Sequence, residues 1–416
     1  MRKNLPRIQF RIPSSAFRIS SILSPSYVTL PLAVFLAMGC VAAFTGQWPW
    51  ADHFYDSYLL QACSWLEGRL DLGQDYAWLE LAIYEGKYYV SFPPFPSYVL
   101  LPFAAIWGEA VKDSAVAWAV TLLGVGYAVR LYELIRRDGK EDFWVLFLYL
   151  GTGYLFISMN SYVWFFAQTL CFTLSLMAIV HAIQGQGGWS LGCWAAAVGC
   201  RPMVIVYLPL LFWLLWKTEE PGHDILGWIK RRWYWAIAPC ALALSYMALN
   251  WARFGNPIEF GHNYLPEFTL AEHGQFSLQY VWKNLLLLLR LPGWRPESNT
   301  VWFYTGDTMA FWLVNPMYIC VFAAFASTLR RKEFRGMAGM LLGMFLVHVF
   351  ILCAHKTLGA WQFGNRYMVD TMPWLFCGLL LWMPQGDGYT KWSMPLFAWG
   401  AALNLIGAAA TYSGWI

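Results

Sequence analysis

Charged side chains are scarce in this sequence: they make up 12% of its 416 residues, against about 25% in soluble globular proteins. A net charge of +4 without a long basic block excludes a nucleic-acid-binding protein. The nine cysteines form no C-x-x-C pair and have no histidine at metal-binding spacing, so the sequence indicates neither a disulfide scaffold nor a thiolate metal site. What is abundant is apolar: 59% of the residues are apolar and 19% are aromatic, as in a polytopic membrane protein with aromatic belts.

Long apolar runs predict an all-α polytopic transmembrane helical bundle with about 11 crossings and outer-face juxtamembrane helices. Single crossings are expected near residues 27–44, 115–135, 142–158, 163–183, 233–251, 309–329, 335–354, 368–384 and 392–412. Two stretches are ambiguous. Residues 93–107 contain four prolines and are short for a crossing, and residues 189–217 are too long for one simple span and are interrupted at Arg201-Pro202.

The distribution of basic residues decides between two topologies. In one, 93–107 stays in the outer leaflet and 189–217 enters and returns; in the other, both segments cross. The first topology places 18 of the 28 Lys and Arg residues in short cytoplasmic segments, as the positive-inside rule favours. We therefore expect a cytoplasmic N-terminal arm (1–27) and one integral membrane domain (28–416) in the cell (plasma) membrane. Its outer loops would be 46–92 (extending to about 114), 252–308 and 355–367, and Ser277–Leu291 is expected to be an amphipathic helix at the membrane surface.

The first outer loop is rich in acids, holding seven of the 24 Asp and Glu residues between Gly46 and Phe92. Each acid alone is readily explained by solvation or by a turn. Together, in a chain so poor in charge, they indicate a site in which carboxylates act as general bases or hold a divalent cation, Mg²⁺ or Mn²⁺. The candidates are Asp52, Asp56 and Glu80.

Three basic residues stand near the same membrane surface. Arg201 interrupts an apolar run, Arg366 precedes the apolar run at 368–384, and Lys87 lies near the end of the acidic loop. Cations at this depth can bind a phosphate at the lipid surface. For Arg366 a structural alternative is an ion pair with Asp370, four residues later.

Six features then follow one another along the chain: a basic N-terminal helix, the acidic loop and four short motifs. The motifs are Tyr84-Glu85-Gly86-Lys87-Tyr88-Tyr89-Val90-Ser91-Phe92-Pro93-Pro94-Phe95-Pro96, Gly199-Cys200-Arg201-Pro202, Asn250-Trp251-Ala252-Arg253-Phe254-Gly255-Asn256-Pro257 and Phe363-Gly364-Asn365-Arg366-Tyr367. This order resembles bacterial members of the polytopic GT-C superfamily of glycosyltransferases, with protein O-mannosyltransferases and aminoarabinose-lipid transferases as more distant relatives. The resemblance covers residues from about 28 to 384.

The resemblance implies a glycosyltransferase that moves a sugar from a polyprenyl-phosphate carrier to a glycan, lipid or protein acceptor at the outer face, with inversion. Asp52 or Asp56 would correspond to the family's acid after the first helix, and Lys87 to a basic residue before a proline pair. Where several relatives have a second acid, this chain has Asn160, which leaves Glu80 for that role. We assign Asp52 as the expected base and Arg366, Arg201 and Lys87 to the phosphate. A lipid-linked sugar transporter (a flippase) and a non-catalytic membrane subunit remain as alternatives.

Overall fold

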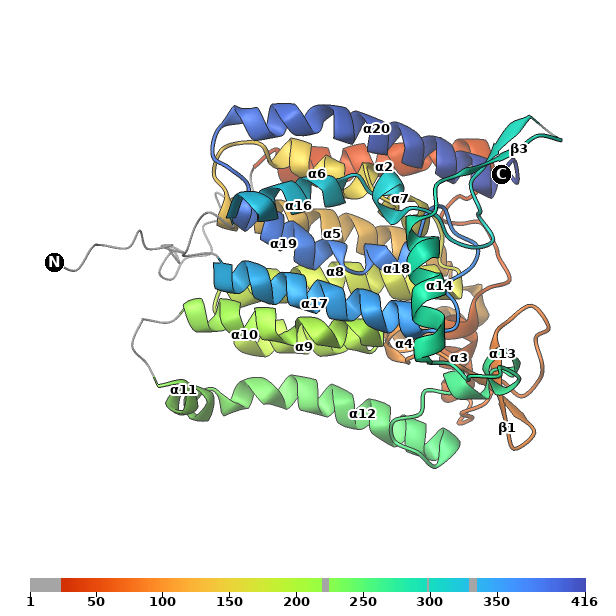
Figure 1. Cartoon of the computed structure of the whole chain (residues 1–416). Coiled ribbons are helices and arrows are strands. Elements are labelled where there is room, and N and C mark those ends of the chain that lie inside the picture. The colour runs from red at the N-terminus through yellow and green to blue at the C-terminus, as the bar shows by residue number, and fades with distance from the viewer. Residues whose placement is uncertain (1–23, 219–223, 298, 329–334) are drawn as a thin grey trace.

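The computed structural model describes residues 24–218, 224–297, 299–328 and 335–416, and within these ranges it is mainly helical (Figure 1). Six helical segments are long and apolar enough to cross a membrane. They are α2 (Ser26–Thr45), α5 (Asp113–Ile135), α8 (Val163–Ile183), α12 (Ile237–Phe254) with the preceding turn η3 (Trp233–Ala236), α17 (Arg335–Ala354) and α20 (Asp387–Tyr412). The all-α membrane architecture predicted from the sequence is therefore confirmed.

The expected number of about 11 crossings is wrong for the described residues, because several apolar runs are broken into shorter helices. The run at 142–158 is divided between α6 (Glu141–Leu150) and α7 (Tyr154–Ser158) by Gly151 and Gly153, and the run at 309–329 is broken before Pro316. The remaining short elements of the bundle are α9 (Gly187–Val198), η2 (Pro202–Tyr207), α10 (Leu208–Lys217), α16 (Met317–Thr328) and α19 (Met372–Trp382).

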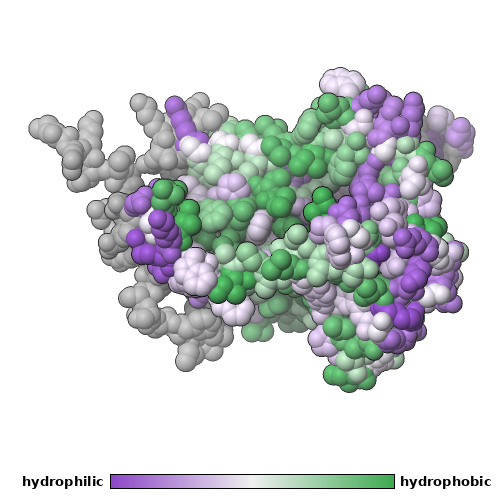
Figure 2. All heavy atoms as spheres, turned by 90° about the horizontal axis from the view of Figure 1, so that it is seen from below, coloured by the Kyte–Doolittle hydropathy of each residue, from purple (hydrophilic) through white to green (hydrophobic). Residues whose placement is uncertain are grey.

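The long helices run side by side, with α8 at the centre of the bundle and α12 at its edge (Figure 1). In α8, 83% of the most apolar stretch is buried, whereas only 17% is buried in the segment that contains α12. The face seen in Figure 2 carries a broad apolar band across its middle, with hydrophilic residues beyond it. Exposed apolar side chains in a continuous band are what a lipid-facing surface requires.

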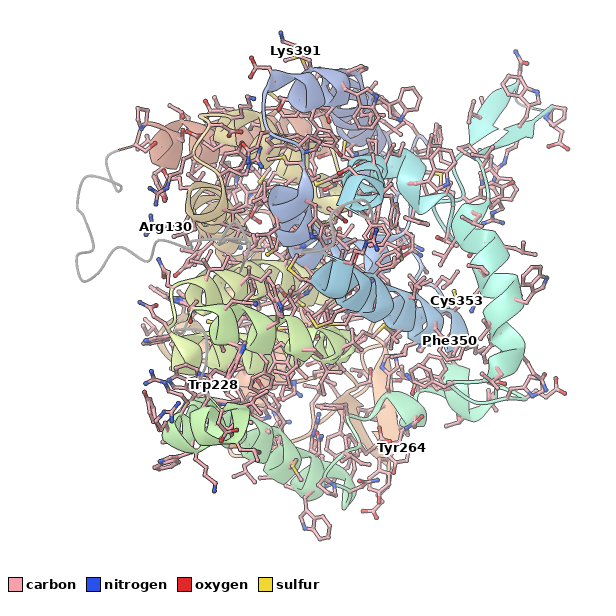
Figure 3. All side chains as sticks on the ribbon, turned by 60° about the vertical axis from the view of Figure 1, so that its left-hand side comes forward. Arg130, Trp228, Tyr264, Phe350, Cys353 and Lys391 are labelled. Atoms are coloured by element: carbon pink, nitrogen blue, oxygen red, sulfur yellow. The ribbon has the colours of Figure 1, made fainter. Side chains whose placement is uncertain are left out.

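One end of the bundle, here called the basic end, gathers the segments predicted to be cytoplasmic. Tyr27 at the start of α2 donates a hydrogen bond to Glu133 near the end of α5, and Lys140 donates one to the carbonyl of Gly386 before α20. Figure 3 shows Arg130 and Trp228 on this side. The basic residues of the N-terminal arm and those at 330–334 lie outside the described residues. The assignment of this end to the cytoplasm, and of the protein to the plasma membrane, stays a prediction.

Both ambiguous stretches behave as the first topology predicts. Helices α9 and α10 form a hairpin that turns at Arg201-Pro202. Its two open ends lie close together, since a Cβ added to Gly185, before α9, would lie 3.5 Å from Thr218, after α10. Helix α4 (Phe95–Trp107) begins beside Gly199 and is followed, after η1 (Gly108–Ala110), by the start of α5. Both ends of α4 therefore lie at the same end of the bundle, opposite the basic end.

The three segments predicted to be outer loops meet at this opposite end, here called the outer-loop end. Its elements are α3 (Ser57–Leu66), β1 (Leu81–Tyr84), β2 (Lys87–Val90), η4 (His262–Tyr264), α13 (Pro266–Thr269), α14 (Leu278–Leu289), β3 (Gly293–Arg295), β4 (Thr300–Trp302), α15 (Phe311–Val314) and α18 (Arg366–Val369). The β1–β2 turn has positive φ at Glu85 (49°) and Gly86 (73°), which is the backbone of a tight hairpin turn. At the basic end, α11 (Ile225–Arg231) precedes α12.

Helix α14 confirms the expected amphipathic helix and lies across the ends of the bundle helices (Figure 1). The Ser277 side chain caps it by accepting a hydrogen bond from Gln279 N at 3.2 Å. Trp282 and Leu286 are exposed on one face, whereas Lys283 and Arg290, seven residues apart, line a cavity on another.

Candidate functional site

A cavity of about 1020 Å³ lies at the outer-loop end, enclosed by all three outer segments and by the ends of bundle helices. The 46–92 segment contributes Glu80 and Ser91, the 252–308 segment contributes His262 and α14, and the 355–367 segment contributes Arg366. Figure 3 shows Tyr264, on η4, in the region between the ends of α17 and α12. The cavity is large enough to hold a head group together with part of a second molecule.

Three of the six residues predicted for the site line this cavity: Glu80, Arg201 and Arg366. The other three do not. Asp52 has a side chain that is 88% exposed and is paired with Lys112, and Lys87 lies on the β1–β2 hairpin, 3.9 Å from the Asp71 carboxylate.

Asp56, the third residue outside the cavity, precedes α3 and is half-buried. Burial raises the pKa of its carboxyl to about 6. Its neighbour Tyr55 does reach the cavity wall. Asp56 is therefore next in sequence to a residue of the cavity wall but does not itself line the cavity.

Arg366 is 4% exposed and carries a guanidinium group without an ion-pair partner within the described part of the chain. Its Nη1 donates to Gln168 Oε1 at 3.3 Å, and its Nε is buried with no hydrogen-bond acceptor. Gly359, at φ +87°, packs so closely that an added Cβ would lie 3.1 Å from this Nε. An uncompensated buried cation on a cavity wall is an anion-binding feature.

The structural alternative, an ion pair between Arg366 and Asp370, does not form in the described part of the chain. Asp370 instead accepts a hydrogen bond from Arg201 Nε at 2.9 Å and another from Gln168 Nε2 at 3.0 Å. The ring of Tyr367 contacts both arginines, with its centre 4.5 Å from the Arg201 guanidinium and 4.6 Å from that of Arg366. The two guanidinium groups are thus no more than about 9 Å apart, one neutralised by Asp370 and the other not.

Glu80 lies on the wall formed by the first outer loop, where Trp164 Nε1 donates a hydrogen bond to its carboxylate at 3.0 Å. Burial by the surrounding walls raises the pKa of Glu80, while the hydrogen bond from Trp164 and the charge of Arg366 oppose this rise. Tyr55 packs against Trp164 with ring centres 5.7 Å apart. A carboxylate beside aromatic rings is a suitable surface for a hydroxyl-bearing ring.

Two residues that bear on the site were not predicted from the sequence. Gln168 is an amide in the mainly apolar α8. It accepts a hydrogen bond from Arg366 and donates one to Asp370, which is itself paired with Arg201. His262 lines the cavity and donates a hydrogen bond from Nδ1 to the Ser91 carbonyl at 3.1 Å. The isolated glutamine in an apolar run was a usable signal, whereas nothing in its sequence context distinguishes His262 from the other six histidines.

The expected divalent cation finds no suitable ligand set among the described residues, where no three His, Cys, Asp or Glu side chains gather as a metal site would require. We therefore derive no step that depends on a metal ion.

Comparisons with known proteins add little. No family model and no curated protein matches the sequence. Among solved structures, the chain is similar to the oligosaccharyltransferase of Archaeoglobus fulgidus in its apo form, with a TM-score of 0.46 and 11% sequence identity. The similarity covers 95% of this chain but only 57% of the oligosaccharyltransferase chain.

Proposed function

We propose that this protein is a membrane glycosyltransferase that takes a sugar from a polyprenyl-phosphate carrier and transfers it to an acceptor hydroxyl in the cavity. The observation that carries the proposal is Arg366, a buried guanidinium group on the cavity wall with no carboxylate partner among the described residues. A phosphate would supply the missing negative charge.

A lipid tail is compatible with the rim of the cavity. Ile258 and Phe276 line the cavity and are also 77% and 51% exposed, so an apolar chain could leave the site between apolar side chains. Trp282 and Leu286 extend this apolar surface along the outer face of α14. A phosphate at Arg366 would then sit at the border between the loops and the lipid-facing helices, where a lipid phosphate lies.

In the proposed reaction, the acceptor oxygen attacks the anomeric carbon while the bond between that carbon and the phosphate oxygen breaks. The bonding electrons leave with the phosphate, whose added charge Arg366 stabilises, assisted by Arg201. Four acids line the cavity, namely Glu80, Glu259, Glu267 and Asp307. We assign Glu80 to take the hydroxyl proton, because it is close enough to Arg366 to feel its charge, whereas Asp307 is paired with Arg290. A single displacement inverts the anomeric centre.

A binding titration with farnesyl phosphate, a short carrier analogue, tests the phosphate assignment. We expect Arg366→Ala to weaken binding by about 10- to 100-fold, because a charge-assisted interaction is lost, and Arg366→Lys to lose less. Lys87→Ala is the matched control, since it removes an exposed cation outside the cavity, and its affinity should equal that of the parent protein. Equal affinity of the parent and Arg366→Ala would contradict the assignment.

Transfer assays separate this function from its alternatives. Purified protein would be given radiolabelled polyprenyl-phosphate sugars and mixed glycan, lipid and protein acceptors. Binding without transfer to any acceptor, together with movement of the lipid-linked sugar across a vesicle membrane, would instead favour a transporter.

A further inference from the structure

His262 is held in one orientation and one protonation state. Its ring packs against Phe92, with centres 5.4 Å apart, and against Phe268, with centres 5.1 Å apart. Since the Ser91 carbonyl can only accept a hydrogen bond, the contact at 3.1 Å places the hydrogen on Nδ1. Burial lowers the pKa of His262 to about 4, so the imidazole is neutral at pH 7 and its lone pair is on Nε2.

The Nε2 atom has no hydrogen-bond partner in the described ranges, and His262 is a wall residue of the cavity. Histidine His355, by contrast, uses both of its ring nitrogens within the protein: Nδ1 contacts the Thr357 carbonyl at 2.8 Å, and Nε2 contacts Gln275 at 3.2 Å. His262 therefore retains a free hydrogen-bond acceptor, whereas His355 is a structural residue.

His262 also lies between the two parts of the proposed reaction. The charge of Arg201 is close enough to contribute to its lowered pKa. On its other side, Ser91 joins it to the Glu80 segment, because the Ser91 hydroxyl donates to the Glu80 carbonyl at 3.0 Å. The transferred group would have to occupy the space between the leaving phosphate and the base.

We propose that His262 is a specificity-determining residue whose Nε2 accepts a hydrogen bond from a hydroxyl or amino group of the transferred sugar. This inference rests on the proposed function. It predicts that the transferred sugar is a neutral sugar and not a uronic acid. A carboxylate at this position would place its lone pairs against the lone pair of Nε2 and would make no hydrogen bond to it. A hydroxyl donates to Nε2 at no such cost.

The test measures affinity for farnesyl phosphate alone and for farnesyl phosphates that carry glucose, mannose or galactose, or the corresponding uronic acids. We expect at least one neutral sugar to bind the parent about ten-fold more tightly than its uronic acid. His262→Leu should lose about ten-fold in affinity for that neutral sugar but keep the affinity of the parent for bare farnesyl phosphate. His262→Gln should retain most of the sugar affinity, because its amide can donate to Ser91 and present a carbonyl to the sugar.

His273→Leu is the matched control, because His273 belongs to the same outer segment but does not line the cavity. The proposal is overturned if uronic acids bind as tightly as neutral sugars, or if His262→Leu keeps the sugar affinity of the parent. It is also overturned if that variant loses affinity for bare farnesyl phosphate to the same extent, which would indicate a structural role. Failure of the proposed function would be seen in a different measurement, namely if the affinity for bare farnesyl phosphate did not depend on Arg366. The proposed role of His262 would then be wrong as well.

Discussion

Two groups of ionisable residues lie at the outer-loop end, and they differ in how their charges are compensated. The loop group lies around the start of α5, where Asp52 pairs with exposed Lys112, and His53 Nε2 contacts Asp113 at 2.9 Å and Ser161 at 2.7 Å. These contacts hold the first outer loop against the bundle. The Asp52–Lys112 pair is exposed, so water and salt screen it and it adds little to stability.

The cavity group consists of Glu80, Arg201, His262 and Arg366, and it includes a buried cation, Arg366, without a carboxylate partner among the described residues. Arg366 has no ion-pair partner, and His262 Nε2 has no donor, within the described part of the chain. The loop group also contains a buried unpaired atom, His53 Nδ1, but its cation Lys112 is paired. Keeping a buried charge unpaired costs stability unless a ligand supplies the partner. The number of charges in a loop is therefore a weaker guide to a site than a buried charge that has no partner.

The largest expected effect is on the turnover rate, and it distinguishes the cavity group from the loop group. Glu80→Gln removes the proposed proton acceptor and should lower turnover by about 10²- to 10⁴-fold. Asp52→Asn, in the loop group, should change turnover by no more than about two-fold, since it loses only an exposed ion pair. Initial rates of transfer at saturating donor measure both. A larger loss in Asp52→Asn than in Glu80→Gln would reverse the assignment and return the base to the loop group.

The next effect concerns stability. Asp370→Asn leaves Arg201 without its ionic partner in a buried position, so we expect a loss of about 3–5 kcal/mol in the free energy of unfolding. Asp113→Asn retains a neutral hydrogen-bonding partner for His53 and should cost about 1 kcal/mol. Thermal unfolding in detergent compares the two variants. Equal losses would mean that the loop group depends on its ion pair as strongly as the cavity group does.

The sequence predicted the features that depend on local composition. The long apolar helices, the hairpin turning at Arg201-Pro202, the surface helix α14 and the meeting of the three outer segments all follow from hydropathy, proline and charge distribution. Helix breaks at Gly151 and Gly153 were missed, because a single glycine in an apolar run is compatible with a continuous helix.

The partners of the charged residues could not be predicted. Spacing of four residues allowed an Arg366–Asp370 pair as an alternative, but Asp370 pairs with Arg201, which is 169 residues away. Likewise, seven acids in one loop gave no indication that Glu80, rather than Asp52, faces the cavity. Such partners are set by tertiary packing, and a sequence contains no local signal for them.

The smallest effect concerns Asp56, the one carboxyl of the loop group whose pKa burial raises, from about 3.8 to about 6. Between these values the folded protein keeps a proton that the unfolded chain has lost, so the free energy of unfolding of the parent should fall as pH rises from about 4 to 6 and level off above. The substituted side chain in the Asp56→Asn variant stays neutral, so the free energy of unfolding of this variant should exceed that of the parent by an amount that grows across this window. We expect a final difference of about 1–2 kcal/mol, which is less than the full pKa shift implies because Asp56 is partly exposed. Unfolding measured from pH 4 to 7 tests this; parallel curves would show that Asp56 is compensated like the rest of the loop group.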